Sequence, residues 1–166
     1  MKNMASPLNA EPVPTLSLSV QYGTDAPVLT RWRIRRWAQA ALRAPELADV
    51  AGVSLTVRLV GAEEAQALNR DFRDKDYATN VLTWEYGADP DGIYHGDVVL
   101  CVPVLEREAR EQQKPLPHHA AHLLVHGLLH ALGYDHLLHE EAEEMEALET
   151  RILNTMSIPD PYRVSS

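Results

Sequence analysis

The segment HGLLHALGYDH, residues 126–136, constrains the fold of this 166-residue chain more than any other stretch. His126 and His130 are four residues apart, so on an α-helix their side chains lie on one face, with β-carbons about 5–6 Å apart. Gly133 suits the position just past a helix end, where the backbone often takes a positive φ. His136 follows three residues later and can return to the same point. The segment therefore predicts a helix that ends before the glycine and presents three imidazoles to one site.

Three neutral imidazoles can bind one metal ion. At distances of about 2.0–2.1 Å they leave the fourth tetrahedral position of zinc open for water, which is the layout of catalytic zinc sites. We therefore expect His126, His130 and His136 to bind one zinc ion, although imidazoles accept other first-row divalent ions as well. Either a place in this cleft or a solvated or capping role is open for His118, His119, His122 and His139.

The residue after the first histidine separates two classes of metal hydrolase. The spacing H-x3-H-x2-G-x2-H is shared with the metzincin proteases, which carry a glutamate directly after the first histidine as general base. In this chain the residue is Gly127, which cannot move a proton. A zinc-dependent amide or peptide hydrolase would keep its metal here and lack its base, and it stays an alternative.

Bulk composition is that of one ordinary globular domain. The length fits a single domain of roughly 150 residues, and 45% hydrophobic with 23% charged residues is close to the globular average. No run reaches the roughly 18 apolar residues of a membrane helix, and the start of the chain lacks the apolar stretch of a signal peptide. We expect a cytoplasmic location and no membrane partner. The net charge of −9 argues against coating nucleic acid by bulk charge, but local basic patches are compatible with it.

Hydrophobic periodicity predicts an α+β fold. Strands are predicted over residues 16–22, 53–60, 81–86 and 96–102, with a polar loop over 71–80. Helices are predicted over residues 30–43 with Thr30 as N-cap, 62–69, 104–113, 117–132 and 140–156. This order indicates a small mixed four-stranded sheet packed with about five helices in a single domain. We expect the domain over residues 15–157, a disordered tail over 1–14 and a C-terminal tail over 158–166.

Motifs on both sides of the histidines extend the pattern. LNRDFRDKDYATNVLTWEY (68–86) and HGDVVLC (95–101) precede them, and EEAEEMEALETRIL (140–153) follows. In this order the blocks resemble the YbeY family of bacterial endoribonucleases, which mature ribosomal RNA. The resemblance implies one metal ion, usually zinc, held by His126, His130 and His136, and a cleft arginine at Arg73. It also implies association with ribosomes and a part in the 3′-end maturation and quality control of 16S ribosomal RNA.

Four positions depart from the family pattern. Ala78 stands where proline is usual, Trp84 where phenylalanine is usual and His95 where leucine is usual, and these changes are expected to alter packing only. Asn80 stands where aspartate is usual. It removes a carboxylate near Arg73, so we assign it no acid or base role.

The chemistry implied is single-strand-specific, metal-dependent cleavage of an RNA phosphodiester. A metal ion can polarise a phosphoryl oxygen and lower the pKa of bound water toward about 7. Arg73 can neutralise phosphate charge with its forked donors, or it can be a solvated loop residue paired with Asp71 or Asp74. Asp135 can accept a proton, orient a histidine ligand from outside or cap the turn.

Basic residues on the first helix offer a second place for RNA. Arg31, Arg33 and Arg36 surround Trp32, on which a base can stack while phosphates meet the arginines. The alternative is a solvated helix face with the tryptophan packed under a loop.

The acidic run over residues 140–149 is expected to be the solvated face of the last helix, or a dock for a basic ribosomal protein. The partners we expect are 16S ribosomal RNA and the ribosome or small-subunit proteins, and no DNA. A ribosome-assembly factor with a mainly structural metal is the other alternative.

Overall fold

The structure, a computed structural model, describes residues 13–134 and 139–162. Within these ranges the strands are β1 (Thr15–Tyr22), β2 (Gly52–Val60), β3 (Val81–Ala88) and β4 (Ile93–Cys101). The α-helices are α2 (Arg31–Leu42), α3 (Ala62–Arg73), α4 (Val102–Glu111), α5 (Leu116–Ala131) and α6 (His139–Asn154), and a 3-10 helix spans Pro45–Leu47. The predicted α+β domain with a four-stranded sheet and five helices is confirmed. No helix in the described part of the chain is long and apolar enough to cross a membrane.

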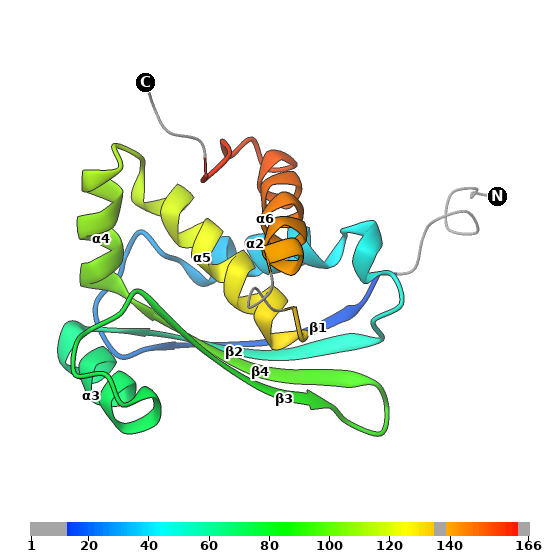
Figure 1. Cartoon of the computed structure of the whole chain (residues 1–166), viewed down its shortest axis with the longest axis horizontal. Helices are drawn as coiled ribbons and strands as arrows, with labels where there is room; N and C mark the ends of the chain where they lie inside the picture. The colour runs from blue at the N-terminus through cyan, green and yellow to red at the C-terminus, as the bar shows by residue number, and fades with distance from the viewer. Residues whose placement is uncertain (1–12, 135–138, 163–166) are drawn as a thin grey trace.

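The sheet is mixed, with strand order β1-β2-β4-β3. β1 and β4 both run parallel to β2, and β3 runs antiparallel to β4. Figure 1 shows α2, α5 and α6 on one side of this sheet and α3 on the other. The two central strands, β2 and β4, are therefore covered, and β1 and β3 form the two edges.

Alternation along the strands places the two hydrophobic cores. Val98 and Leu100 of β4 belong to the large core beneath α5, whereas Val99 and Cys101 belong to a smaller core that includes Ala65 of α3. An unbroken apolar run is what a strand covered on both faces requires. The prediction of β4 as a central strand is confirmed.

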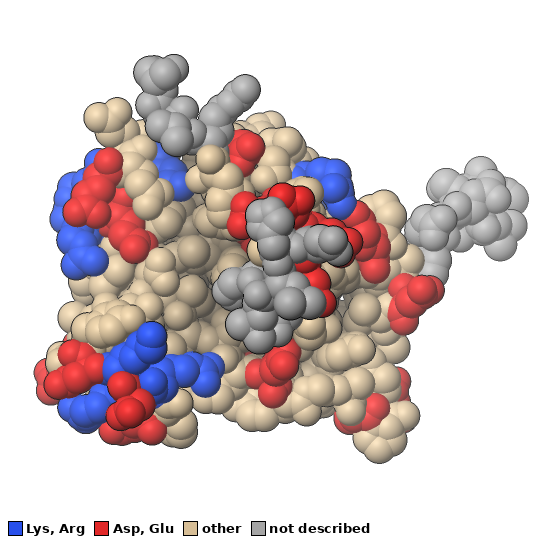
Figure 2. All heavy atoms as spheres, viewed as in Figure 1, with Lys and Arg blue, Asp and Glu red and all other residues tan. Residues whose placement is uncertain are grey.

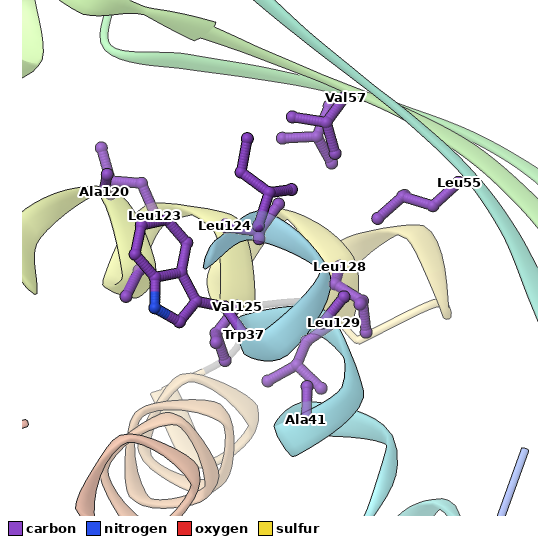
Figure 3. Packing of buried hydrophobic residues seen from close by; sticks show 14 of the residues in the cluster. Trp37, Ala41, Leu55, Val57, Ala120, Leu123, Leu124, Val125, Leu128 and Leu129 are labelled. Carbon is purple, nitrogen blue, oxygen red and sulfur yellow. The ribbon is translucent and has the colours of Figure 1, made fainter. Parts of the chain in front are cut away.

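Helix α5 lies at the centre of the large core. Figure 3 shows its leucines and Val125 between Trp37 and Ala41 of α2 and the β2 side chains Leu55 and Val57. The helix lies close against the sheet at Gly127. A β-carbon there would lie 2.9 Å from both γ-methyls of Val98 and 3.2 Å from Oγ1 of Thr83. Because such contacts are shorter than packed atoms tolerate, this position accepts no side chain without a shift of its neighbours.

The predicted helix ends are confirmed at both helices with clear end signals. The Thr30 side chain accepts a hydrogen bond from the backbone N–H of Arg33 at 3.2 Å, as an N-cap does. Gly133 has a φ of +96°. The backbone N–H groups of Gly133 and Tyr134 donate to the carbonyls of His130 and Leu129 at 2.9 and 3.1 Å, which closes α5 in a Schellman motif.

Several segment boundaries differ from the prediction by a few residues, and three of these differences have a clear structural reason. Helix α3 continues to Arg73, so a polar loop beginning at residue 71 is wrong; the helix end is fixed by Asp74, whose φ of +59° is left-handed. Strand β4 begins at Ile93 because it pairs there with Gly52 of β2. In the expected C-terminal tail, Ile158 is 7% exposed and packs in the large core. The first twelve residues of the expected N-terminal tail lie outside the described part of the chain.

Candidate active site

Two of the three expected ligand histidines lie together on α5. His126 and His130 are both partly buried, and their rings meet edge to face with centroids 4.7 Å apart. One helical turn separates them, as the four-residue spacing requires. The third histidine, His136, and the neighbouring Asp135 lie outside the described residues, so their roles stay predictions.

A buried carboxylate from α6 holds the first of these histidines. Oε2 of Glu149 lies 2.7 Å from Nδ1 of His126, and the Glu149 side chain has no exposed surface. The other oxygen, Oε1, lies 3.0 Å from Nε2 of His122 and also accepts a hydrogen bond from the Tyr162 hydroxyl. Glu149 therefore connects α5, α6 and the segment after α6 at one point.

The protonation of this cluster follows from its hydrogen bonds. Burial by itself would raise the pKa of Glu149, but the hydrogen bonds from His122, His126 and Tyr162 outweigh it and hold the pKa at about 2. The ionised carboxylate can only accept, so Nδ1 of His126 carries a proton and the lone pair of the neutral ring is on Nε2. Burial and the contact with Glu149 raise the pKa of Tyr162.

This arrangement fits a metal ligand. Metal-binding histidines typically donate their other ring N–H to a carboxylate or carbonyl, which fixes the ring and its tautomer. His126 and Glu149 have this relationship. Within residues 13–134 and 139–162, no three His, Cys, Asp or Glu side chains converge on one point, and the expected third ligand, His136, falls in the gap between these ranges.

Arg73, the last residue of α3, lines a pocket together with His130. Its guanidinium donates to the backbone carbonyl of Thr83 on β3 at 2.6 Å and lies 5.5 Å from the centre of the Trp84 ring. A pocket of about 360 Å³ is lined by Arg73, Trp84 and His130, among others. Arg73 hydrogen-bonds to β3, whereas Asp71 pairs with Arg70 at 3.3 Å, so the expected alternative pairing of Arg73 with Asp71 is not what the structure has.

Two further histidines of α5 have structural partners. His119 is 4% exposed at its side chain, and its Nε2 lies 2.8 Å from Oε1 of Glu108 on α4. Burial lowers the pKa of His119. Because His119 is buried and bonded to Glu108, a solvated role for it is wrong. Asn80 donates to the same carboxylate at 3.1 Å, so its amide joins the start of β3 to α4. His122 faces Glu149, and His118 lines a separate pocket.

The basic cluster of α2 does not line the pocket that holds Arg73 and His130. Arg31 donates to the Val20 carbonyl of β1 at 3.3 Å, and Arg33 donates to the Val28 carbonyl at 2.7 Å. Arg36 lies 5.7 Å from the centre of the Trp32 ring. Trp32 is 66% exposed, so it is not packed under a loop.

The acidic run on α6 divides into two kinds of residue. Most of its described glutamates are exposed, as expected of a solvated face, but Glu149 is fully buried. The prediction that the whole run is solvated is therefore wrong at Glu149. A signal was present: Glu149 lies four residues after Met145 and three before Ile152, which places it on the apolar stripe of the helix.

Comparisons with known proteins find relatives over most of the chain. The family model described as Endoribonuclease YbeY matches residues 21–157. A protein named Endoribonuclease YbeY from Bordetella pertussis is 61% identical over 150 residues, which covers 89% of this chain and 96% of that protein. One of the same name from Thiobacillus denitrificans is 53% identical and covers 90% and 97%.

A solved structure has the same fold. The solution structure of TM1509 from Thermotoga maritima superposes with a TM-score of 0.56 at 22% identity and covers 88% of this chain and 99% of that one. At this identity the likeness concerns the fold alone. From the family model and the relatives together, this chain belongs to the Endoribonuclease YbeY family.

Proposed function

We propose that this chain is a metal-dependent endoribonuclease that cuts single-stranded RNA. The observation that carries the proposal is the pocket shared by Arg73 and His130, beside a second histidine, His126, whose Nδ1 is held by the buried Glu149. The site thus combines candidate metal ligands with a cation suited to phosphate. The names of the curated relatives support the same activity.

The residues divide the work as follows. His126, His130 and His136 would hold a zinc ion or another first-row divalent ion, which would supply Lewis acidity toward the phosphate when bound. Glu149 keeps His126 in the tautomer that has its lone pair on Nε2. Arg73 is positioned by the Thr83 carbonyl and neutralises the charge that builds up on the phosphate. Asp135 is a proton acceptor or an orienting group in this scheme.

The RNA is 16S ribosomal RNA, and the reaction belongs to its 3′-end maturation and to ribosome quality control in the cytoplasm. Small-subunit proteins or the ribosome are the partners. This part of the proposal rests on the family resemblance of the motif blocks between residues 68 and 153.

The test is cleavage of a 16S ribosomal RNA fragment by purified protein, with His130→Ala and Arg73→Glu carried through the same preparation. Arg70→Glu is the matched control, since Arg70 lies on the same helix and is not among the residues that line the pocket. We expect cleavage by the wild type and Arg70→Glu, and a loss of roughly 10²-fold or more in kcat for Arg73→Glu, the size seen when one transition-state donor is removed.

Three outcomes contradict the proposal. Equal cleavage by every variant assigns the activity to a contaminant. Absence of RNA cleavage, together with loss of ribosome binding and of melting temperature in His130→Ala, favours the assembly factor with a structural metal. Chelator-sensitive cleavage of a peptide by the wild type favours the amide hydrolase instead.

A further inference from the structure

The only phenylalanine of the chain is exposed beside the pocket. Phe72 is 58% exposed although it is among the most apolar of side chains. It precedes Arg73 in the last turn of α3. Its ring stands perpendicular to that of Trp84, with centroids 5.6 Å apart. Trp84 therefore fixes the orientation of the Phe72 ring, and more than half of the phenylalanine surface still faces solvent.

Trp84 connects Phe72 to the site. The indole lines the pocket with Arg73 and His130, packs against the smaller core, and has the Arg73 guanidinium 5.5 Å from its centre. Because several sides of the indole are in contact, the open aromatic surface of this pair is that of Phe72. The Phe72 ring and the Arg73 guanidinium therefore lie next to the same indole, 5.6 and 5.5 Å from its centre.

The charge around Phe72 is balanced. Figure 2 shows Lys and Arg atoms intermixed with Asp and Glu atoms over α3, bordering an uncharged surface in the middle of the face. Arg70 is engaged by Asp71 at 3.3 Å and lies 4.0 Å from Asp76. A broad basic patch is therefore not what would attract RNA to the end of α3. Arg73 and the exposed Phe72 ring are the groups left to bind it.

We infer that Phe72, held perpendicular to Trp84, is a stacking platform for one unpaired base of the RNA whose phosphate meets Arg73. The inference rests on the proposed function and adds a specificity element to it. Every base has an aromatic face, so stacking is tolerant of sequence. A base within a duplex is already stacked on both sides, so the platform selects single-stranded segments.

The test separates stacking from general packing. The equilibrium dissociation constant of short single-stranded RNA is measured by fluorescence anisotropy in the His130→Ala background, where turnover is removed from every sample. Phe72→Leu keeps an apolar side chain without the ring, and Phe72→Tyr keeps the ring. Trp32→Leu removes another largely exposed aromatic, on α2, which does not line the pocket that holds Arg73. A series of oligonucleotides with one abasic position each locates the base that stacks.

We expect Phe72→Leu to weaken binding roughly fivefold or more, the lower range for loss of one base–aromatic contact. Phe72→Tyr and Trp32→Leu bind as the parent does. One abasic position weakens the parent to the same degree and leaves Phe72→Leu unaffected. All variants keep the parent melting temperature, since residue 72 is exposed.

Parent-like RNA binding by Phe72→Leu overturns the inference, and so does a loss that is the same for every abasic oligonucleotide. Phe72 would then be better read as part of a protein-docking surface. Failure of the proposed function looks different, because the wild type would not cleave RNA at all. If the Phe72→Leu single variant cleaves RNA with the kcat/KM of the wild type, the proposed function is unaffected. Only the role of Phe72 as a stacking platform is then rejected.

Discussion

Glu149 illustrates how much of the site depends on one residue. Its two oxygens engage His126 on one side and His122 and Tyr162 on the other. A carboxylate without solvent exposure is costly unless it is fully hydrogen-bonded, and these partners provide that compensation. The cost is justified where the carboxylate fixes a metal ligand, because ring orientation and basicity both depend on it.

Replacing Glu149 by glutamine is therefore expected to weaken metal binding. Glutamine keeps the shape and one acceptor but loses the charge that strengthens the Nδ1 bond of His126, and comparable changes around metal-bound histidines cost about 10- to 100-fold in affinity. Competition of zinc between the protein and a chromophoric chelator measures the effect. Glu146→Gln, at an exposed position of the same helix, is the control. Equal zinc affinities for the two variants would contradict the role given to Glu149.

At the scale of elements, local chemistry fixed much of the fold in advance. Thr30 and Gly133 predicted helix ends because their preferences act within one turn of backbone. Strand faces followed from alternation in the same way. The extension of α3 to Arg73 was not predictable, because polar residues there have no periodic signal and the arginine is held by a carbonyl ten residues away.

The candidate site, too, was predictable from the sequence only in part. The shared face of His126 and His130 follows from helical geometry. The burial of Glu149 follows only from the packing of α6 against α5, which local sequence does not determine. The stripe position of this residue was the one available signal, and it was outweighed by the five other glutamates of the run over residues 140–149.

The contact between α5 and the sheet can be tested at Gly127. Gly127→Ala brings a β-carbon within 2.9 Å of both Val98 methyls. Overpacking typically costs about 1–3 kcal/mol, and alanine recovers up to about 1 kcal/mol through helix propensity. We expect the free energy of unfolding to fall by about 1–2 kcal/mol in urea titrations.

A double-mutant cycle with Val98→Ala identifies the cause. Removing the two methyls makes room for the new β-carbon, so Val98→Ala should cost less in the Gly127→Ala protein than in the wild type. Strict additivity of the two changes would show that the contact is not the source of the loss.

For the whole molecule, the sheet separates two cationic regions. Arg31 donates to a carbonyl of β1 and Arg73 to a carbonyl of β3, and these are the two edge strands. Three strand spacings separate the edges, about 14 Å. With a net charge of −9, RNA is guided by such local groups and not by the overall field. An RNA must therefore reach from one edge of the sheet to the other before it meets both regions.

This geometry makes the effect of the α2 arginines depend on RNA length. Arg33→Glu with Arg36→Glu should leave the affinity for a hexanucleotide unchanged. For a strand of about 20 nucleotides it should weaken binding and reduce the salt slope by roughly 1.4, the value for two lost phosphate contacts on a single strand. Arg107→Glu with Arg110→Glu on α4 makes the same change in net charge and is the control. An unchanged slope with the long strand would remove α2 from the RNA path.

The packing at Gly127 also bears on how histidine motifs diverge among hydrolases. The change from Gly127 to glutamate would complete the protease-like motif, and it requires a single codon position in many glycine codons. Here, however, the new side chain would be driven into Val98 and Thr83. The Gly127→Glu protein would lose stability, whether or not the new carboxylate could act as a general base. The packing of α5 against the sheet therefore disfavours this substitution, however few nucleotide changes it requires.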